Sequence, residues 1–354
     1  MSGGVDSSVA AALLLEQGHD VTGVFMKNWS DTKDPRTGEC AWKEERRDAM
    51  AVAAYLGIPF ETYDFEEAYR KHVVDYLYRE YAAGRTPNPD VLCNSAVKFD
   101  LFLKKALASG ADAIATGHYA RVAKSGVKGQ TSNVTYRLLA GVDRSKDQSY
   151  FIFRLGQEEL ARVLFPIGEL DKEDVRAYAR HAGLPTAEKK DSQGICFIGK
   201  VDLKDFLKDA IVQKPGPIET TEGEVLGTHA GIAPFTIGQR HGLGLGGGTP
   251  YFVVGKDMDR NALIVAKGID HPALYRKTLT ANELSWVSGE EPAMPFECEA
   301  RIRYRQPLQK CVVKPGVNPG TVDVEFDRPQ RAVSPGQFIV FYAHDDVLGG
   351  GVIL

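Results

Sequence analysis

The stretch that decides the fold stands at the start of the chain: Ser2-Gly3-Gly4-Val5-Asp6-Ser7-Ser8, followed at once by the apolar run from Val9 to Leu15. Glycines let the backbone approach an anion, serine hydroxyls donate hydrogen bonds, and a helix start adds unpaired N–H groups and the positive end of its dipole. The stretch therefore predicts a phosphate-binding loop that opens onto a helix. It is not a Walker loop, because no Gly-Lys-Ser or Gly-Lys-Thr follows. The alternative is a serine-capped helix after a tight turn.

Outward from this loop, helical and strand patterns alternate through the first 120 residues. We expect helices near 7–17, 43–56, 66–83 and 95–109, and strands at 21–26, 60–64 and 111–116. This rhythm predicts an α/β fold with a doubly wound parallel sheet, in which ligand-binding residues follow the carboxyl ends of strands. A loop of this kind normally follows a buried strand, and the sequence begins at the loop. We therefore expect the sheet to be one strand short and the loop to be poorly anchored.

The texture of the sequence changes after about residue 200. Glycine and proline punctuate short strand-like runs, and from about 275 to the end the pattern is wholly strand-like. We expect the phosphate-loop domain to occupy 1–200, a small central β-rich domain 201–273, and a closing β-barrel 274–354.

Composition limits the class of protein. At 354 residues, with 43% hydrophobic and 25% charged residues, the chain has the composition of a soluble modular enzyme. No apolar run is long enough for a bilayer and no secretory signal is readable, while five scattered cysteines do not suggest a disulfide framework. We therefore expect a reducing cytoplasm. A net charge of −4 argues against indiscriminate nucleic-acid coating and limits any RNA site to one face.

Two cysteines stand in contexts that suggest chemistry. Prolines stiffen the segment 86–94, in which Asp90 precedes Cys93 by three residues at an expected helix start, where a thiolate is favoured. Lys189 and Lys190 precede Cys196, where they can lower its thiol pKa or hold a phosphate. No Cys-x-x-Cys accompanies either site, so we expect no metal. Two buried, inert cysteines are the alternative, and we interpret Cys40, Cys298 and Cys311 as structural.

Arginines alternate with other residues in Arg301-Ile302-Arg303-Tyr304-Arg305. In a strand, alternate side chains share a face, so this pattern predicts a stripe of three guanidinium groups that binds phosphate. A solvated charged strand face is the alternative.

Seven motifs occur in order along the chain: SGGVDSS, AGRTPNPDVLCN, ATGHYAR, KDQSYF, KKDSQGICFIG, FTIGQRHGLG and RYRQ. The first resembles the signature of the PP-loop ATP pyrophosphatase superfamily, and together they resemble the family of the bacterial tRNA-specific 2-thiouridylase MnmA. The resemblance implies that ATP, with Mg²⁺, adenylates the 2-carbonyl oxygen of the wobble uridine of a tRNA, and that sulfur then replaces that oxygen. It also implies tRNAs for lysine, glutamate and glutamine as substrates, and a sulfur-relay protein or cysteine desulfurase as donor.

The resemblance assigns roles to residues. Cys196 would carry the persulfide and Cys93 would be its catalytic partner, the two forming a transient disulfide, with Asp90 in acid-base work. Both direct persulfide attack and hydrosulfide release are compatible with these residues. ATP would be bound by Ser2, Gly3, Gly4, Val5, Asp6, Ser7, Met26 and Gly117. The tRNA would be contacted by Asn88, Pro89, Asp90, His118, Lys146, Asp147, Gln148, Arg303, Tyr304 and Gln337.

Two other functions are kept as alternatives. One is a different AMP-forming PP-loop ligase or amidotransferase, which would need neither cysteine nor tRNA. The other is a tRNA-binding remnant whose ATP site is disabled by the absent first strand.

Overall fold

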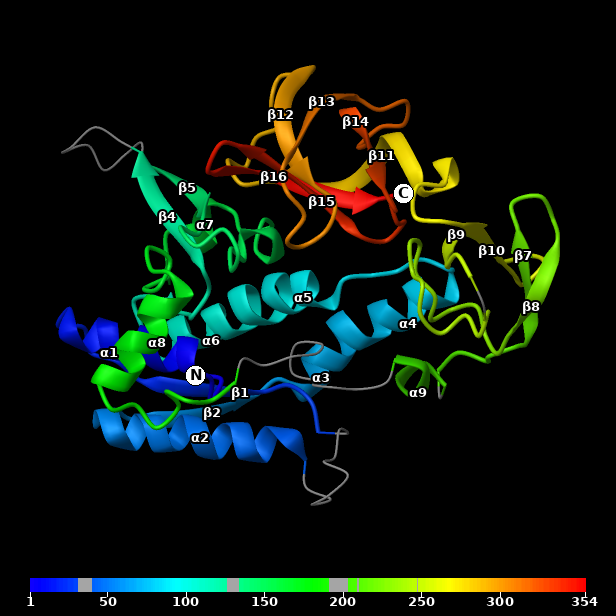
Figure 1. Cartoon of the computed structure of the whole chain (residues 1–354). Coiled ribbons are helices and arrows are strands. Elements are labelled where there is room, and N and C mark those ends of the chain that lie inside the picture. The colour runs from blue at the N-terminus through cyan, green and yellow to red at the C-terminus, as the bar shows by residue number, and fades with distance from the viewer. Residues whose placement is uncertain (31–39, 126–133, 191–202, 209, 247) are drawn as a thin grey trace.

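The computed structural model describes residues 1–30, 40–125, 134–190, 203–208, 210–246 and 248–354. An α/β part, a small β-rich part and a C-terminal barrel follow one another along the chain (Figure 1), which confirms the predicted fold class. Among the described residues, no helix combines the length and the apolar character that crossing a membrane requires.

Parallel strand pairs frame the α/β part. β1 (Gly23–Lys27) pairs in parallel with β2 (Phe60–Asp64), and β3 (Ile114–Ala115) pairs in parallel with β6 (Val163–Leu164). Between β1 and β2 the chain forms α2 (Ala41–Leu56), which packs on β1 and on α1 (Val5–Glu16). The start of the chain contacts both pairs, because the Met1 amine donates to the Val24 carbonyl of β1 and Gly117, after β3, packs against Asp6 and Ser7.

Two helical segments cross the middle of the molecule (Figure 1), and each contains a π-helical stretch. The first runs through α3 (Glu66–Tyr69), η1 (Arg70–Val74) and α4 (Asp75–Ala82), and the second through α5 (Pro89–Leu92), η2 (Cys93–Phe102) and α6 (Leu103–Ala108). The second begins earlier than the predicted residue 95. The Asn88 side chain accepts from the Asp90 N–H, and Pro89 occupies the first turn, so these residues cap a helix rather than extend a loop.

The rest of the α/β part reaches towards the C-terminal barrel. A hairpin of β4 (Ala120–Ser125) and β5 (Thr135–Ala140) pairs through β5 with the last strand of the barrel, where Leu138 lies opposite Val347. The remaining elements are short: η3 (Ser149–Phe151), α7 (Gln157–Leu160), α8 (Lys172–His181) and α9 (Leu203–Leu207).

The central part is a four-stranded sheet in the order β8-β7-β10-β9. Its strands are β7 (Gly216–Thr220), β8 (Val225–His229), β9 (Tyr251–Asp257) and β10 (Ala262–Lys267). Ile218, Phe235, Val253 and Leu263 form its core, which is separate from the other cores of the molecule.

The C-terminal part is a closed six-stranded barrel preceded by η4 (Pro272–Leu274). Around the barrel the order is β11 (Tyr275–Trp286), β14 (Val322–Arg331), β13 (Gln309–Pro315), β12 (Phe296–Arg301), β15 (Phe338–Ala343) and β16 (Asp346–Ile353), and pairing of β16 with β11 closes it. The predicted strand over Arg301–Arg305 is wrong. β12 ends at Arg301, and the chain then turns, with Arg305 at a positive φ of 64°.

The three cysteines that we interpreted as structural all make contacts within the protein. Cys40 donates from its Sγ to the Ser30 carbonyl. Cys298 on β12 lies directly opposite Cys311 on β13, with their sulfur atoms 3.6 Å apart at the edge of the barrel core. The hydrogen bond with Cys311, and secondly burial, raise the pKa of the Cys298 thiol, so Cys298 is held as a neutral thiol.

A buried ion pair joins the barrel to the α/β part. Arg301, at the end of β12, donates from its Nη1 to Asp147 Oδ2 over 2.9 Å, and the two side chains are 7% and 0% exposed. The other carboxylate oxygen of Asp147 accepts from the Gly141 and Ser149 N–H groups. The guanidinium also lies 5.2 Å from the centre of the Tyr342 ring. Because both charges are buried, each depends on the other for compensation.

Removing only the arginine should destabilise the protein strongly. We expect Arg301→Met to lower the free energy of unfolding by about 3–5 kcal/mol, because it leaves the Asp147 charge buried without its partner. Urea unfolding followed by circular dichroism measures the loss. The double variant Arg301→Met with Asp147→Asn should recover much of it, and Arg305→Met, which alters an exposed arginine, should change little. Equal stability of Arg301→Met and Arg305→Met would contradict this account.

Candidate active site

The phosphate loop is closed by its own hydroxyl groups. Gly4 is the N-cap of α1, and its carbonyl accepts from Ser7 Oγ over 3.1 Å and from Ser8 Oγ over 2.9 Å. Ser2 Oγ lies 3.2 Å from Ser7 Oγ. Gly3 has a positive φ of 74°, and a Cβ there would collide with the Glu45 carbonyl, so only glycine fits. The loop thus has the compact form expected of an anion cradle at a helix start, and the expectation that it is poorly anchored is wrong.

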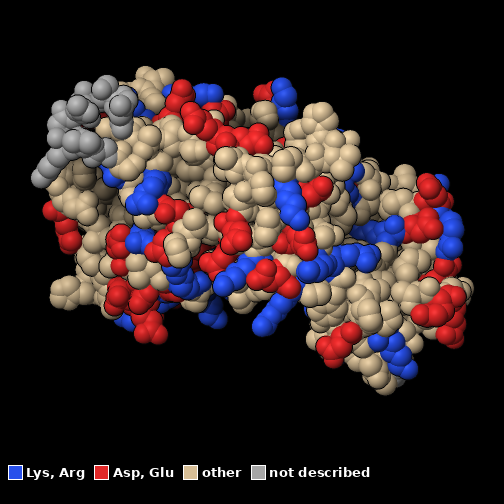
Figure 2. All heavy atoms as spheres, turned by 90° about the horizontal axis from the view of Figure 1, so that it is seen from above, with Lys and Arg blue, Asp and Glu red and all other residues tan. Residues whose placement is uncertain are grey.

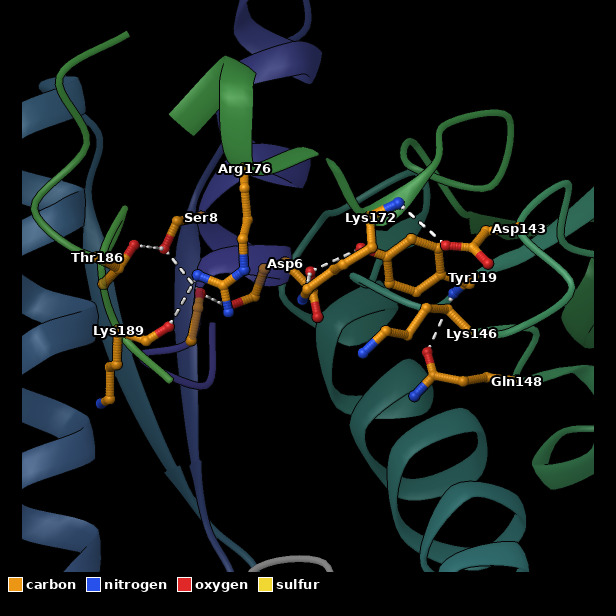
Figure 3. A network of polar contacts seen from close by, with 12 residues as sticks. Asp6, Ser8, Tyr119, Asp143, Lys146, Gln148, Lys172, Arg176, Thr186 and Lys189 are labelled. Carbon is orange, nitrogen blue, oxygen red and sulfur yellow. Dashed lines mark hydrogen bonds and ion pairs between the residues drawn. The ribbon is translucent and has the colours of Figure 1, made fainter. Parts of the chain in front are cut away.

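Asp6 binds two side chains that come from distant parts of the chain. Its Oδ1 accepts from Lys172 Nζ over 2.7 Å and from the Tyr119 hydroxyl over 2.9 Å (Figure 3). Lys172 is the first residue of α8, where its backbone N–H donates to Asp143 Oδ2, and its side chain is only 11% exposed. Sequence reasoning missed Lys172, because nothing in its neighbourhood marks it and it lies 166 positions from Asp6.

The segment that follows α8 returns to the loop. Thr186 Oγ1 donates to Ser8 Oγ over 2.9 Å, and Arg176 Nη1 donates to the carbonyls of Ala187 and Lys189 over 3.2 Å (Figure 3). The Lys189 ammonium pairs with Asp48. Lys189 is therefore engaged within the protein. Cys196 belongs to 191–202, which lies outside the described residues, so the predicted approach of Cys196 to Cys93 stays a prediction.

Gly117 packs against the phosphate loop, whereas Met26 lies on β1. Met26 is buried on β1. A Cβ on Gly117 would lie 2.6 Å from the Asp6 carbonyl carbon, so the end of β3 touches the loop backbone directly. Their role in binding ATP stays a prediction.

Cys93 lies inside a helix, which corrects the expectation of a loop or a helix start. It is the first residue of η2 and its side chain is fully buried. The helix begins four residues earlier, so the dipole of the first turn acts on Asp90 rather than on the thiol. Asn94 Nδ2 donates to the Asp90 carbonyl over 2.9 Å, which ties this turn together.

The barrel places Gln337 against the segment that carries Asn88, Pro89 and Asp90. Gln337 Nε2 donates to the Thr86 carbonyl over 2.8 Å, and the Thr86 N–H donates to the Pro335 carbonyl. Gln337 therefore positions the start of this segment.

The loop 146–148 is held between the α/β part and the C-terminal barrel. Tyr304 donates from its hydroxyl to the Lys146 carbonyl over 3.5 Å, and Gln148 Oε1 accepts from the Tyr119 N–H over 3.1 Å. Asp147 is buried in its ion pair with Arg301, so its side chain positions the loop rather than contacting tRNA directly.

The predicted arginine stripe is wrong. Arg301 is buried against Asp147, and Arg303 Nη2 donates to the Ile237 and Ala332 carbonyls and to Ser334 Oγ. Arg303 therefore joins the central part to the barrel, and burial lowers the pKa of its guanidinium. Arg305 is exposed and, with Arg144, Ser145 and Lys146, lines a surface cavity of about 380 Å³.

Basic and acidic side chains are mixed on one face of the molecule. Figure 2 shows Lys and Arg mixed with Asp and Glu over the face seen from above. A protein of net charge −4 with this distribution has no uniformly positive face in that view. The expectation that any RNA site is limited to one face stays a prediction.

His118 is a buried, neutral side chain. Its Nδ1 lies 2.7 Å from Thr116 Oγ1, and its ring packs against Phe99 and Phe165. Burial, and secondly the charge of Lys98, lower the pKa of His118 well below its ordinary value. The imidazole is therefore uncharged at neutral pH.

Acid should destabilise the protein through His118. Its folded pKa lies below the unfolded value of about 6.5, so the unfolded chain binds the extra proton first and stability falls as pH drops through 6.5. We expect the midpoint of thermal unfolding to fall less between pH 7 and pH 5 in His118→Gln than in the parent. Histidine NMR that shows the His118 ring protonating near pH 6.5 would contradict this prediction.

Comparison with known proteins gives the same three parts. Residues 1–200 match the tRNA methyl transferase HUP domain, 204–267 the tRNA methyl transferase PRC-barrel domain, and 276–353 the aminomethyltransferase beta-barrel domain. Proteins named tRNA-specific 2-thiouridylase MnmA from Halalkalibacterium halodurans and Geobacillus thermodenitrificans are each 52% identical over 354 residues, covering 100% of this chain and 93% of theirs. The relative of that name from Alkalilimnicola ehrlichii is 51% identical over 358 residues, covering 100% of this chain and 95% of its own. A chain that aligns along its whole length at this identity belongs to the tRNA-specific 2-thiouridylase MnmA family.

Proposed function

We propose that this protein is an ATP-dependent sulfurtransferase that replaces the 2-carbonyl oxygen of the wobble uridine of tRNA with sulfur. The observation that carries the proposal is the junction of a Ser/Gly phosphate loop, a buried thiol and barrel loops. Gly117 touches the loop at Asp6, His118 follows it, and Gln337 holds the segment that leads to Cys93. The family relationship supports the same activity and tRNA as the substrate.

The phosphate loop would bind ATP. The N–H groups at the start of α1 and the hydroxyls of Ser2 and Ser7 would donate hydrogen bonds to the phosphates of ATP. Lys172 adds a positive charge beside them. Mg²⁺ fits a site made of the Asp6 carboxylate and the phosphates of ATP. The described residues contain no cluster of three metal-binding side chains, but Mg²⁺ is usually held by one or two carboxylates together with substrate phosphates, and Asp6 offers such a carboxylate. When bound, the ion would neutralise charge on the phosphates.

The chemistry needs an activated leaving group. The uracil 2-oxygen attacks the α-phosphorus of ATP and pyrophosphate leaves, so that the ring carbon then bears AMP in place of a poor leaving group. The outer sulfur of a Cys196 persulfide supplies the new carbon–sulfur bond, and AMP departs with the electron pair of the broken carbon–oxygen bond. The Cys93 thiolate attacks the inner sulfur and frees the outer one, which leaves a Cys93–Cys196 disulfide that two electrons restore.

The tRNA would be positioned by the segments that the barrel holds. Asn88, Pro89 and Asp90 stand at the start of α5, beside Gln337, while Lys146 and Tyr304 meet through a hydrogen bond. Arg305 and Arg144 line a cavity with Lys146 and offer positive charge for phosphate. Uridine in an anticodon loop needs only a few kcal/mol to leave its stack. Asp147, Arg301 and Arg303 act on this surface through other residues.

Sulfur incorporation tests the function directly. We expect nucleoside mass spectrometry of tRNA incubated with the protein, ATP, Mg²⁺ and a sulfur source to show 2-thiouridine at the wobble position. Cys93→Ser and Cys196→Ser should each abolish it, because both sulfurs take part in the exchange, whereas Cys40→Ser should not. Pyrophosphate release that needs neither cysteine nor tRNA would instead favour another AMP-forming ligase.

The charge at Lys172 should matter for ATP binding. We expect Lys172→Met to weaken MgATP binding about tenfold or more, since a charge-assisted contact contributes about 1.5–3 kcal/mol and each 1.4 kcal/mol is tenfold in affinity. Equilibrium dialysis with labelled ATP measures the change. Arg180→Met, on the same helix but in an exposed pair with Glu188, is the matched control. Equal affinities of the two variants would contradict a role for Lys172, and tRNA binding without any ATP binding would favour a tRNA-binding remnant.

A further inference from the structure

A lysine lies one helical turn beyond Cys93. The segment from Cys93 to Phe102 is π-helical, so each backbone bond spans five residues and Lys98 stands one turn after Cys93. Stretches of π-helix are rare in proteins, and those that do occur are often found at functional sites. In this winding Lys98 follows both Cys93 and Asn94 along the same side of the helix, which a regular α-helix would not achieve for Cys93.

The ammonium group of Lys98 is held back towards the start of the helix. Its Nζ donates to Asn94 Oδ1 over 2.8 Å, and Asn94 in turn donates to the Asp90 carbonyl. Nζ also lies 3.5 Å from His118 Nε2. An ammonium group can only donate, so His118 Nε2 is the acceptor and its Nδ1 carries the proton that is donated to Thr116. Lys98 is thus fixed by residues on two separate elements.

The charge of Lys98 acts across the candidate site. It is the second cause, after burial, of the lowered pKa of both His118 and the Met1 amine, which lies at the start of the phosphate loop. Lys98 therefore stands near the loop as well as on the helix of Cys93. His118 cannot supply this charge, because it is held neutral.

Other charged groups around η2 are engaged elsewhere or exposed. Glu66 on α3 binds Lys27, Lys104 on α6 binds Asp100, and Arg70 and Lys105 lie over the rings of Trp29 and Tyr63. Glu67 on α3 and Lys71 and His72 on η1 are exposed to solvent. Asp90 on α5 carries the opposite sign from Lys98. Of these groups, Lys98 is the cation that stands one π-helical turn from Cys93, and this position is the basis of the inference that follows.

We propose that Lys98 is a positioning residue of the sulfur-transfer step, whose ammonium group, held by Asn94 and neutral His118, keeps the buried Cys93 in its thiolate form. This inference rests on the proposed function, in which Cys93 attacks the inner sulfur of a persulfide. Only a thiolate performs that attack. Burial without a nearby cation favours the uncharged thiol, and an opposite charge close by favours the thiolate.

The test is a titration of Cys93 itself, which requires neither ATP nor tRNA. Ultraviolet absorbance of thiolates is measured against pH in the full-length protein, and the same curve for Cys93→Ser is subtracted to isolate Cys93. Lys98→Gln keeps a polar side chain of similar reach but removes the charge, and it is measured with and without Cys93→Ser. We expect its midpoint to rise by about one pH unit or more. Lys98→Arg should keep the midpoint of the parent, and so should Lys104→Gln, the control on the next turn of the helical segment.

An unchanged midpoint in Lys98→Gln would overturn the proposal, whether or not the protein thiolates tRNA. If Lys98→Gln does not fold, Asn94→Ala, which releases the ammonium group from its tether, should raise the midpoint in the same direction, and no shift there would count against the proposal. In single-turnover thiolation, Lys98→Gln should slow sulfur transfer at neutral pH and regain rate as pH rises, with pyrophosphate release unaltered. If the parent protein releases no pyrophosphate, the proposed function is refuted, whereas the result of the Cys93 titration still stands.

Discussion

The ion pair between Arg301 and Asp147 is the contact on which the arrangement of this site depends. It lies where the barrel meets the α/β part, with both side chains almost fully buried, and two backbone N–H groups complete the shell of the carboxylate. Burying two charges is costly, and the cost is tolerable only when the geometry brings them together. An ion pair of this kind therefore selects one docking of the barrel. Docked in this way, the barrel presents Tyr304 to Lys146 and Gln337 to Thr86.

In the phosphate loop, too, a negative charge is compensated by a residue from elsewhere in the chain. Asp6 would be an isolated carboxylate beside a ligand of the same sign, but Lys172 and Tyr119 bind it from two other elements. Lys189 is similarly matched by Asp48. The loop can present N–H groups and hydroxyls to an anion because its one acidic side chain is compensated. Its positive partner, Lys172, carries the charge that the proposed ATP site would use.

The Cys93 thiol is placed differently from what its local sequence indicated. Cys93 is buried within a helix, beyond the turn in which the dipole is strong, so the helix start contributes little to its ionisation. The π-helical winding and the contacts of Lys98 offer another source of stabilisation, from a side chain rather than from the backbone. A buried thiol whose ionisation is favoured by such a cation would suit the proposed step, in which sulfur is transferred away from water.

The sequence alone determined the phosphate loop, the alternation of helices and strands, the barrel at the C-terminus, the two cysteine contexts and the family. These features depend on neighbours in the chain: glycines where the backbone turns, caps at helix starts, and periodic apolar residues. Tertiary structure alone decided which charges are solvated and which are paired. Arg301 and Arg303 looked like a phosphate-binding stripe, but their partners, Asp147 and the Ile237 carbonyl, come from positions far away in the chain. Lys172 and Lys98 had no local mark either, because the field at a site is the sum of charges that only folding brings together.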